Sequence, residues 1–149
     1  MAWQVCARSK SGEEGSTMSD GSKKVAGVLK AADVTTFKGD PNIYTGQVLA
    51  NRLGYAEHPE GLTLHLVTFF DGACTNWHIH PAGQILHVTT GVGQFQREGE
   101  EVVTLLPGDT VTIEPNVRHW HGAAKGQLFA HLAINGDKAP QWFEQVDRS

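Results

Sequence analysis

From Val25 onward, short runs of apolar or alternating residues recur along the chain, separated by residues that favour turns. The runs are rich in β-branched and aromatic side chains, and Gly, Pro, Asn and Asp lie between them, which is typical of strands joined by hairpins. Residues 91–93 and 107–109 are the clearest turns. The predicted strand-like runs are residues 44–53, 62–70, 75–80, 84–91, 92–105, 109–115, 118–123 and 127–134.

This pattern predicts an all-β fold. Many short antiparallel strands build a sandwich or a closed barrel, and a closed barrel of this size has room for one small-molecule site.

The two ends of the chain differ from the rest. Residues 1–24 are rich in Ser, Gly, Lys and acidic residues without apolar periodicity, so we expect a disordered leader, or a cloning remnant before a natural start at Met18, ahead of one domain over residues 25–149. Only residues 139–146 resemble a short helix.

Composition and charge narrow the class of protein. The 149 residues are 40% hydrophobic and 19% charged, a balance typical of one globular domain. The net charge is −4 and no basic patch is present, so we expect no nucleic-acid partner. No apolar run approaches the roughly 20 residues of a membrane-spanning helix, so we expect no membrane partner. Two cysteines, Cys6 and Cys74, do not make a disulfide framework, and we expect a reducing, cytoplasmic location.

Two histidine pairs, each with one residue between its members, carry the candidate chemistry. His78 and His80 lie in a strand-like run, and side chains alternate across a strand, so both imidazoles face one side and Ile79 faces the other. Residues 81–83 supply a turn, after which Gln84 opens the next strand. Gln84 can therefore return to the side of the first pair.

His119 and His121 repeat this spacing on another strand. Convergence of four such nitrogen- or oxygen-donor side chains inside a barrel would create a metal site. Imidazole binds Zn, Fe, Ni and Mn, and an amide oxygen suits Mn or Fe without excluding the others. In the alternative interpretation the histidines are ordinary structural residues, and Gln84 only hydrogen-bonds a bound water.

Two segments resemble the characteristic motifs of the cupin superfamily. The first has Gln where the family usually has Glu, and it reads Gly72-x5-His78-x-His80-x3-Gln84-x6-Gly91. Residues 114–123 resemble the second motif without its first proline, its glycine and its final asparagine, but with its metal-ligating histidine at His119. The segments VTTGVGQFQREG, LPGDTV, HWHGAA and HLAI are similar to one-domain bacterial cupins related to the manganese-dependent hydroxynitrile lyases and to carboxymuconolactone-decarboxylase-like cupins.

The resemblance implies a fold and a site. The fold would be the cupin double-stranded β-helix, a jelly-roll barrel. The site would hold one divalent metal through His78, His80, Gln84 and His119, with Mn expected and Fe, Zn or Ni as alternatives. A histidine at the position of His131 would act as base or substrate anchor.

The residues around the proposed base partly support that role. His131 shares its strand face with Phe129 and Ala133, and an imidazole on an apolar inward face needs a partner, which a pocket supplies. A satisfied core histidine is the alternative. His121 shares a face with His119, so it should also reach the pocket or its rim, as a second base or as a hydrogen-bonding group.

The other histidines give weaker signals. His87 alternates away from Gln84 and is expected on the outside of the barrel, and His65 could face either side of its strand. His58, next to Pro59, is expected in an exposed loop.

The expected activity is that of a metal-dependent lyase acting on a small carbonyl-derived molecule. Cleavage or formation of cyanohydrins is the specific reaction that the resemblance implies. Two alternatives stay open: a non-haem iron dioxygenase of a small organic substrate, and a non-enzymatic cupin that binds a metal or a ligand. The edge strands, together with Trp142 and Phe143 on an exposed tail, predict a homodimer or a higher homo-oligomer.

Overall fold

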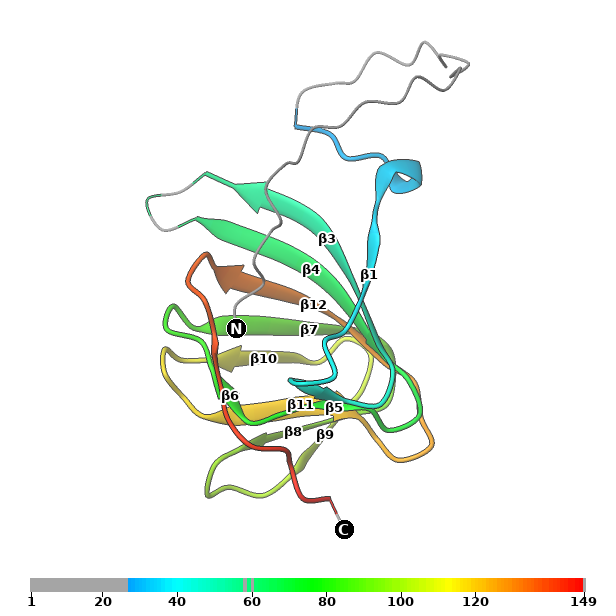
Figure 1. The fold of residues 1–149 in the computed structure, drawn as a ribbon, viewed down its shortest axis with the longest axis vertical. Coiled ribbons are helices and arrows are strands. Elements are labelled where there is room, and N and C mark those ends of the chain that lie inside the picture. Colours follow the sequence, from blue (N-terminus) through cyan, green and yellow to red (C-terminus); the bar gives the residue numbers. More distant parts are fainter. Residues whose placement is uncertain (1–26, 58, 60, 149) are drawn as a thin grey trace.

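The computed structural model describes residues 27–57, 59 and 61–148, which form a jelly-roll barrel of two antiparallel β-sheets (Figure 1). The all-β prediction is confirmed, because the only helical element in the described part of the chain is a short 3-10 helix, η1 (Ala31–Asp33). The predicted leader, residues 1–24, and the loop residue His58 lie outside the described residues. Within these residues no helix has the length and apolar character needed to cross a membrane.

The first sheet has six strands in the spatial order β1-β3-β4-β12-β7-β10. Figure 1 shows β3, β4, β12, β7 and β10 stacked one below another, with β1 along the edge next to β3. These strands are β1 (Thr36–Lys38), β3 (Val48–Ala56), β4 (Leu62–Phe69), β7 (Gln84–Gly91), β10 (Thr110–Ile113) and β12 (Phe129–Gly136).

The second sheet is centred on β11. Strand β8 pairs with one edge of β11 and with β9, while β5 and β6 pair with β11 at different positions and carry β2 and β13. These strands are β2 (Tyr44–Thr45), β5 (Cys74–Thr75), β6 (His78–Ile79), β8 (Gly93–Arg97), β9 (Val103–Leu105), β11 (His119–Ala123) and β13 (Gln141–Trp142).

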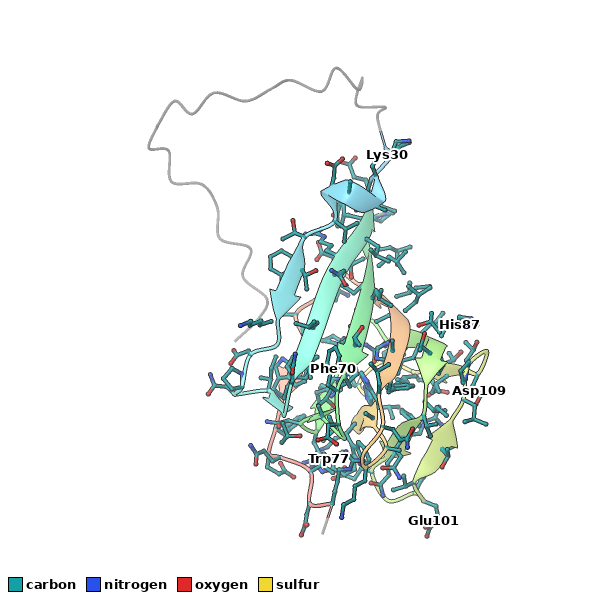
Figure 2. The ribbon with its side chains drawn as sticks, turned by 90° about the vertical axis from the view of Figure 1, so that its right-hand side faces the viewer. Lys30, Phe70, Trp77, His87, Glu101 and Asp109 are labelled. Carbon is teal, nitrogen blue, oxygen red and sulfur yellow. The ribbon has the colours of Figure 1, made fainter. Side chains whose placement is uncertain are left out.

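Alternating burial along the strands places the core between the two sheets. In β7, Leu86 and Val88 are buried, whereas His87 is exposed, so its predicted outward orientation is confirmed (Figure 2). Phe69 and Phe129 lie in the centre with 0% exposure and ring centroids 6.0 Å apart. Burial of each such ring contributes about 1.5–3 kcal/mol to the stability of this core.

Two glycines allow the chain to leave one sheet and enter the other between β7 and β8. Gly91 has φ +77°, and a Cβ there would lie 1.8 Å from the carbonyl oxygen of Leu128. A Cβ at Gly93 would lie 2.2 Å from the ring of Phe129. The predicted turn at residues 91–93 is therefore a corner of the barrel that only glycine fits.

Three of the predicted strand-like runs are divided in the structure. Residues 44–53 separate into β2 and β3 at Gly46, which has φ +73°. Residues 75–80 separate into β5 and β6, because this segment pairs with β11 at two separate points and is not paired with it in between. Residues 92–105 fold back on themselves as the hairpin of β8 and β9.

The predicted helix over residues 139–146 is wrong. This segment runs down the barrel as an extended strap (Figure 1, orange to red), and β13 pairs with β6. The edge of β6 has backbone N–H and C=O groups that pair with the strap, and Trp142 packs against His78 there. These contacts outweigh the weak helical pattern of the segment. Arg118 also pairs with Glu144 and lies 4.7 Å from the ring of Phe143. Trp142 and Phe143 therefore pack against their own chain as half-buried residues rather than forming an exposed tail.

Candidate active site

Short pairings between β6 and β11 bring the two histidine pairs together. His78 and His119 are direct cross-strand partners. The backbone N–H of Asn116, in the turn before β11, donates to the carbonyl oxygen of His80 at 3.0 Å. Gly83, with φ +76°, then turns the chain so that Gln84 begins β7 beside them. Local turns and ladder contacts thus position four polar side chains at one point.

Three imidazoles form the centre of this group. Ring nitrogen atoms of His78, His80 and His119 lie within 4.8 Å of one another, and all three residues are at least nine-tenths buried. Oε1 of Gln84 lies 3.1 Å from Nε2 of His119. Three nitrogens and one amide oxygen at this spacing fit a divalent metal ion.

Hydrogen bonds fix the tautomers of two of the imidazoles. Nδ1–H of His78 donates to the carbonyl oxygen of Asn76 at 3.0 Å, and Nδ1–H of His119 donates to that of Val117 at 2.9 Å. A carbonyl oxygen can only accept, so both rings keep a lone pair on Nε2. Metal-ligating histidines are held by this same arrangement.

The orientation of Gln84 adds a second indication of a cation. Nε2 of Gln84 donates to Oδ1 of Asn135 at 2.8 Å, which turns Oε1 toward His119. Nε2 of His119 also lacks a hydrogen, so two lone pairs face each other across 3.1 Å. This repulsive contact would become favourable if both atoms bound the same cation.

Burial keeps the three imidazoles neutral. Burial, followed by the nearby His119, lowers the pKa of His80 from 6.5 to about 4. Burial also lowers the pKa of His119 to about 4, although its hydrogen bond to Val117 acts in the opposite direction. The pKa of His78 is lowered well below its ordinary value, again mainly by burial. Neutral imidazoles are the form that binds metals.

A second histidine group lies next to the first. His121 follows His119 on the same face of β11, and its ring centroid lies 5.3 Å from that of His78. Its Nδ1 lies 3.2 Å from Nε2 of His131 on β12. We call His121 and His131 the histidine dyad. His131 was expected to need a partner on its apolar strand face, and His121 supplies one.

The outer nitrogens of the dyad are different from the ligand-like nitrogens. Nε2 of His121 and Nδ1 of His131 are buried and have no hydrogen-bond partner among the described residues. Burial lowers the pKa of His131 to about 4, although the Leu132 backbone acts in the opposite direction, and it lowers the pKa of His121 well below its ordinary value. One hydrogen is shared between the rings, so one outer nitrogen carries a lone pair.

His78, His80, Gln84 and the histidine dyad line a single cavity of about 780 Å³. Its walls also include the side chains of Val67, Ala133 and Trp142. His65, whose direction the sequence left open, faces this cavity as well. The site thus combines apolar walls with a few polar groups, as small-molecule sites do.

Comparisons with known proteins show the family to which the chain belongs. The family model of the cupin domain matches residues 65–134. A curated relative, (R)-mandelonitrile lyase from Granulicella tundricola, is 45% identical over 112 residues, which cover 73% of this chain and 86% of the relative. The chain belongs to the cupin family.

Solved cupin structures share the fold. A cupin-like protein from Thermotoga maritima is 38% identical, with a TM-score of 0.70 over 74% of this chain and 86% of that one. A cupin 2 conserved barrel domain protein from Rhodopseudomonas palustris is 19% identical, with a TM-score of 0.64 over 74% of this chain and 78% of that one. The predicted jelly-roll cupin fold is therefore confirmed.

All six predicted site residues lie within the region that matches the cupin domain. Two further residues of the site lie beyond this region and were not predicted from the sequence. Asn135 holds Gln84, and Trp142 stacks on His78 with ring centroids 4.5 Å apart. Asn135 could have been found by continuing the alternation from His131 through Ala133. The position of Trp142 had no sequence signal, because it depends on where the strap meets β6.

Proposed function

We propose that this cupin is a manganese-dependent lyase that cleaves or forms cyanohydrins of small carbonyl compounds. The observation that carries the proposal is the pairing of a metal-ligand cluster with a histidine dyad in one cavity. The 45% identity to a chain named (R)-mandelonitrile lyase supports the choice of reaction. In this proposal His78, His80, Gln84 and His119 are the metal ligands, and His121 and His131 carry the proton.

The ligand set supports a particular charge state. Three neutral imidazoles and the neutral amide of Gln84 contribute no negative charge, unlike a set with the usual carboxylate. A divalent ion bound there would supply Lewis acidity that favours an alkoxide or cyanide near it. The choice of Mn rests on the oxygen donor of Gln84, because amide oxygen is a hard ligand.

The histidine dyad supports the proton transfer. The lone pair on the outer nitrogen of the dyad takes the proton from the cyanohydrin hydroxyl. The oxygen electrons then form the carbonyl, the bond between carbon and cyanide breaks, and the cyanide leaves with that bonding pair. The proton held by the dyad passes to cyanide, so that carbonyl compound and hydrogen cyanide are released in equal amounts. The reverse sequence forms the cyanohydrin.

The surroundings of the dyad suit a neutral base. His131 packs against Phe69 and Phe129, with ring centroids 5.7 and 5.4 Å away. These apolar rings exclude water from one side of the imidazole, and burial holds its pKa at about 4. The dyad is therefore uncharged and can accept a proton at mildly acidic pH, where the uncatalysed reaction is slow.

The test is cleavage of mandelonitrile to benzaldehyde, followed by absorbance at mildly acidic pH. Protein loaded with Mn²⁺ should exceed both free Mn²⁺ and His119→Ala treated with the same ion. Absence of cleavage above free Mn²⁺ contradicts the lyase activity. The same assay with and without oxygen distinguishes a dioxygenase, which would consume oxygen.

A further inference from the structure

The two ends of the Gln84 amide differ in chemistry but hardly in shape. The carbonyl oxygen can bind a cation, whereas the NH2 group has hydrogens and no available lone pair. The terminal torsion of glutamine has a broad and roughly two-fold preference. Nothing within Gln84 itself therefore selects the end that faces the three histidines.

Asn135 contacts the amino end of this amide. Its Oδ1 accepts a hydrogen bond from Nε2 of Gln84 at 2.8 Å, and the two residues are direct partners in the ladder between β7 and β12. Because a carbonyl oxygen only accepts, this contact is compatible with the NH2 end alone. The oxygen end is then left facing Nε2 of His119, 3.1 Å away.

The backbone around Asn135 holds it in place. Asn135 follows His131 and Ala133 on the cavity side of β12, and its carbonyl oxygen accepts from Oγ1 of Thr63 at 3.4 Å. The next residue is Gly136, where a Cβ would lie 2.4 Å from Cβ of Ala82. Because Gly136 has no side chain, β12 packs closely against the turn that leads into Gln84.

We propose that Asn135 is a positioning residue that keeps the oxygen of Gln84 toward the metal and so sets the preference of the site for a hard cation. This inference rests on the metal ligands assigned under the proposed function. A glutamate at position 84 would offer two equivalent oxygens and would need no such partner. The neutral amide needs one, so Gln84 and Asn135 form a functional pair.

The experiment measures Mn²⁺ and Zn²⁺ affinity of the full chain by calorimetry. Asn135→Leu removes the acceptor at similar volume, and we expect Mn²⁺ affinity to fall about 10-fold or more, the usual scale for a partner of a metal ligand. Zn²⁺ affinity should fall less, because three imidazoles already satisfy zinc. Asn135→Asp keeps an acceptor and should retain Mn²⁺ binding. A general loosening of the site would weaken both ions equally and would not be rescued by aspartate.

A double-mutant cycle with Gln84→Ala separates the possible causes. If Asn135 acts through Gln84, Asn135→Leu causes no further loss of Mn²⁺ affinity in a protein that already carries Gln84→Ala. An equal loss in both backgrounds, or an unchanged ratio of Mn²⁺ to Zn²⁺ affinity, overturns the inference. Asn135→Ala replaces the leucine variant if thermal unfolding shows that leucine prevents folding.

The same measurements distinguish this inference from the proposed function. Tight Mn²⁺ binding with the expected coupling, but without mandelonitrile cleavage, overturns the lyase activity and supports the pairing of Gln84 with Asn135. Cleavage together with unchanged Mn²⁺ affinity in Asn135→Leu overturns the pairing alone.

Discussion

His119 and His121 lie two residues apart on one face of β11, and both are buried, yet their surroundings differ. Nδ1 of His119 is tied to the carbonyl oxygen of Val117, and its Nε2 faces Gln84. Among the described residues, the only hydrogen-bond partner of the His121 ring is the imidazole of His131, and its Nε2 has none. One strand thus carries a histidine whose lone pair is fixed and another whose hydrogen can move.

The difference teaches that burial alone does not assign a histidine its role. Burial lowers the pKa in both groups, so both are neutral near pH 7. What separates them is the partner of the second ring nitrogen. A carbonyl oxygen accepts and so fixes the tautomer, whereas another imidazole can either donate or accept. We therefore expect metal binding to depend on the first group and proton transfer on the second.

The largest expected effect is on metal content. Alanine at His78, His80 or His119 removes one of three clustered imidazoles, and Mn²⁺ affinity should fall by more than about 100-fold, beyond the usual cost of losing an outer partner. Elemental analysis and calorimetry on each variant measure this. His87→Ala is the matched control, because His87 lies on the outside of β7 and should retain full binding. Full metal retention in all three variants would show that the cluster is structural.

The next effect is on turnover without loss of metal. His131→Ala should lower mandelonitrile cleavage by about 10²-fold or more, the usual scale for a positioned base. Its Mn²⁺ content should stay near that of the unaltered protein, because His131 belongs to the dyad and not to the ligand cluster. Near-normal turnover in this variant would contradict the role of His131 and leave His121 as the base. A comparable loss of metal would erase the distinction between the two groups.

A third prediction concerns the acid stability of the metal-free protein. The folded pKa of His80, His119 and His131 is about 4, below the ordinary 6.5. Between these values the unfolded chain binds protons that the folded chain excludes, so the free energy of unfolding falls as pH falls from 6.5 toward 4. Each histidine can contribute up to about 1.4 kcal/mol per pH unit.

Urea unfolding at pH 7.5, 5.5 and 4.5 measures this loss. Mn²⁺ should protect against it in part, because bound metal stabilises the folded state and competes with protons at the ligand cluster. The dyad is not protected in this way, so some acid sensitivity should persist in the loaded protein. Equal stability of the metal-free protein at all three pH values would show that these histidines are not buried neutral groups.

The sequence predicted the barrel and the ligand cluster better than it predicted the edges of the site. Alternation and turns, which are local properties of the chain, bring Gln84 and the two histidine pairs to one side, and the resemblance chose His119 rather than His121 as the last ligand. The contact of His121 with His131 depends on the distance between β11 and β12 in opposite sheets, and local patterns do not encode it. The strap was misjudged as a helix because its pairing with β6 comes from a segment about 60 residues away in the chain.

The homodimer, the expected location and the absence of a nucleic-acid partner stay predictions. An unpaired edge strand supported the oligomer, and part of that reasoning is weakened because Trp142 packs against His78. Five of the six chosen site residues also belong to the shared cavity, and His119 reaches it through Gln84. The two groups were already expected from the spacing of the histidine pairs and from the resemblance, while the hydrogen-bond partners that distinguish their ring nitrogens appear only in the structure.

The smallest expected effects are those of Gln84→Glu, and they are opposite in direction: Mn²⁺ affinity should rise while turnover should fall. Gln84→Glu places a carboxylate in the ligand cluster, and Mn²⁺ should bind about 10-fold more tightly, because a carboxylate is a better ligand for a hard cation. The added negative charge should slow cleavage, since it opposes the build-up of alkoxide or cyanide beside the ligands. Calorimetry and the benzaldehyde assay at saturating Mn²⁺ separate the two effects. A Gln84→Glu variant that is faster than the unaltered protein would contradict the charge argument even if the lyase activity is present. Slower turnover with metal saturation would instead indicate that the neutral amide serves the reaction at some cost in metal affinity, and that the ligand cluster is tuned for the chemistry that the dyad performs.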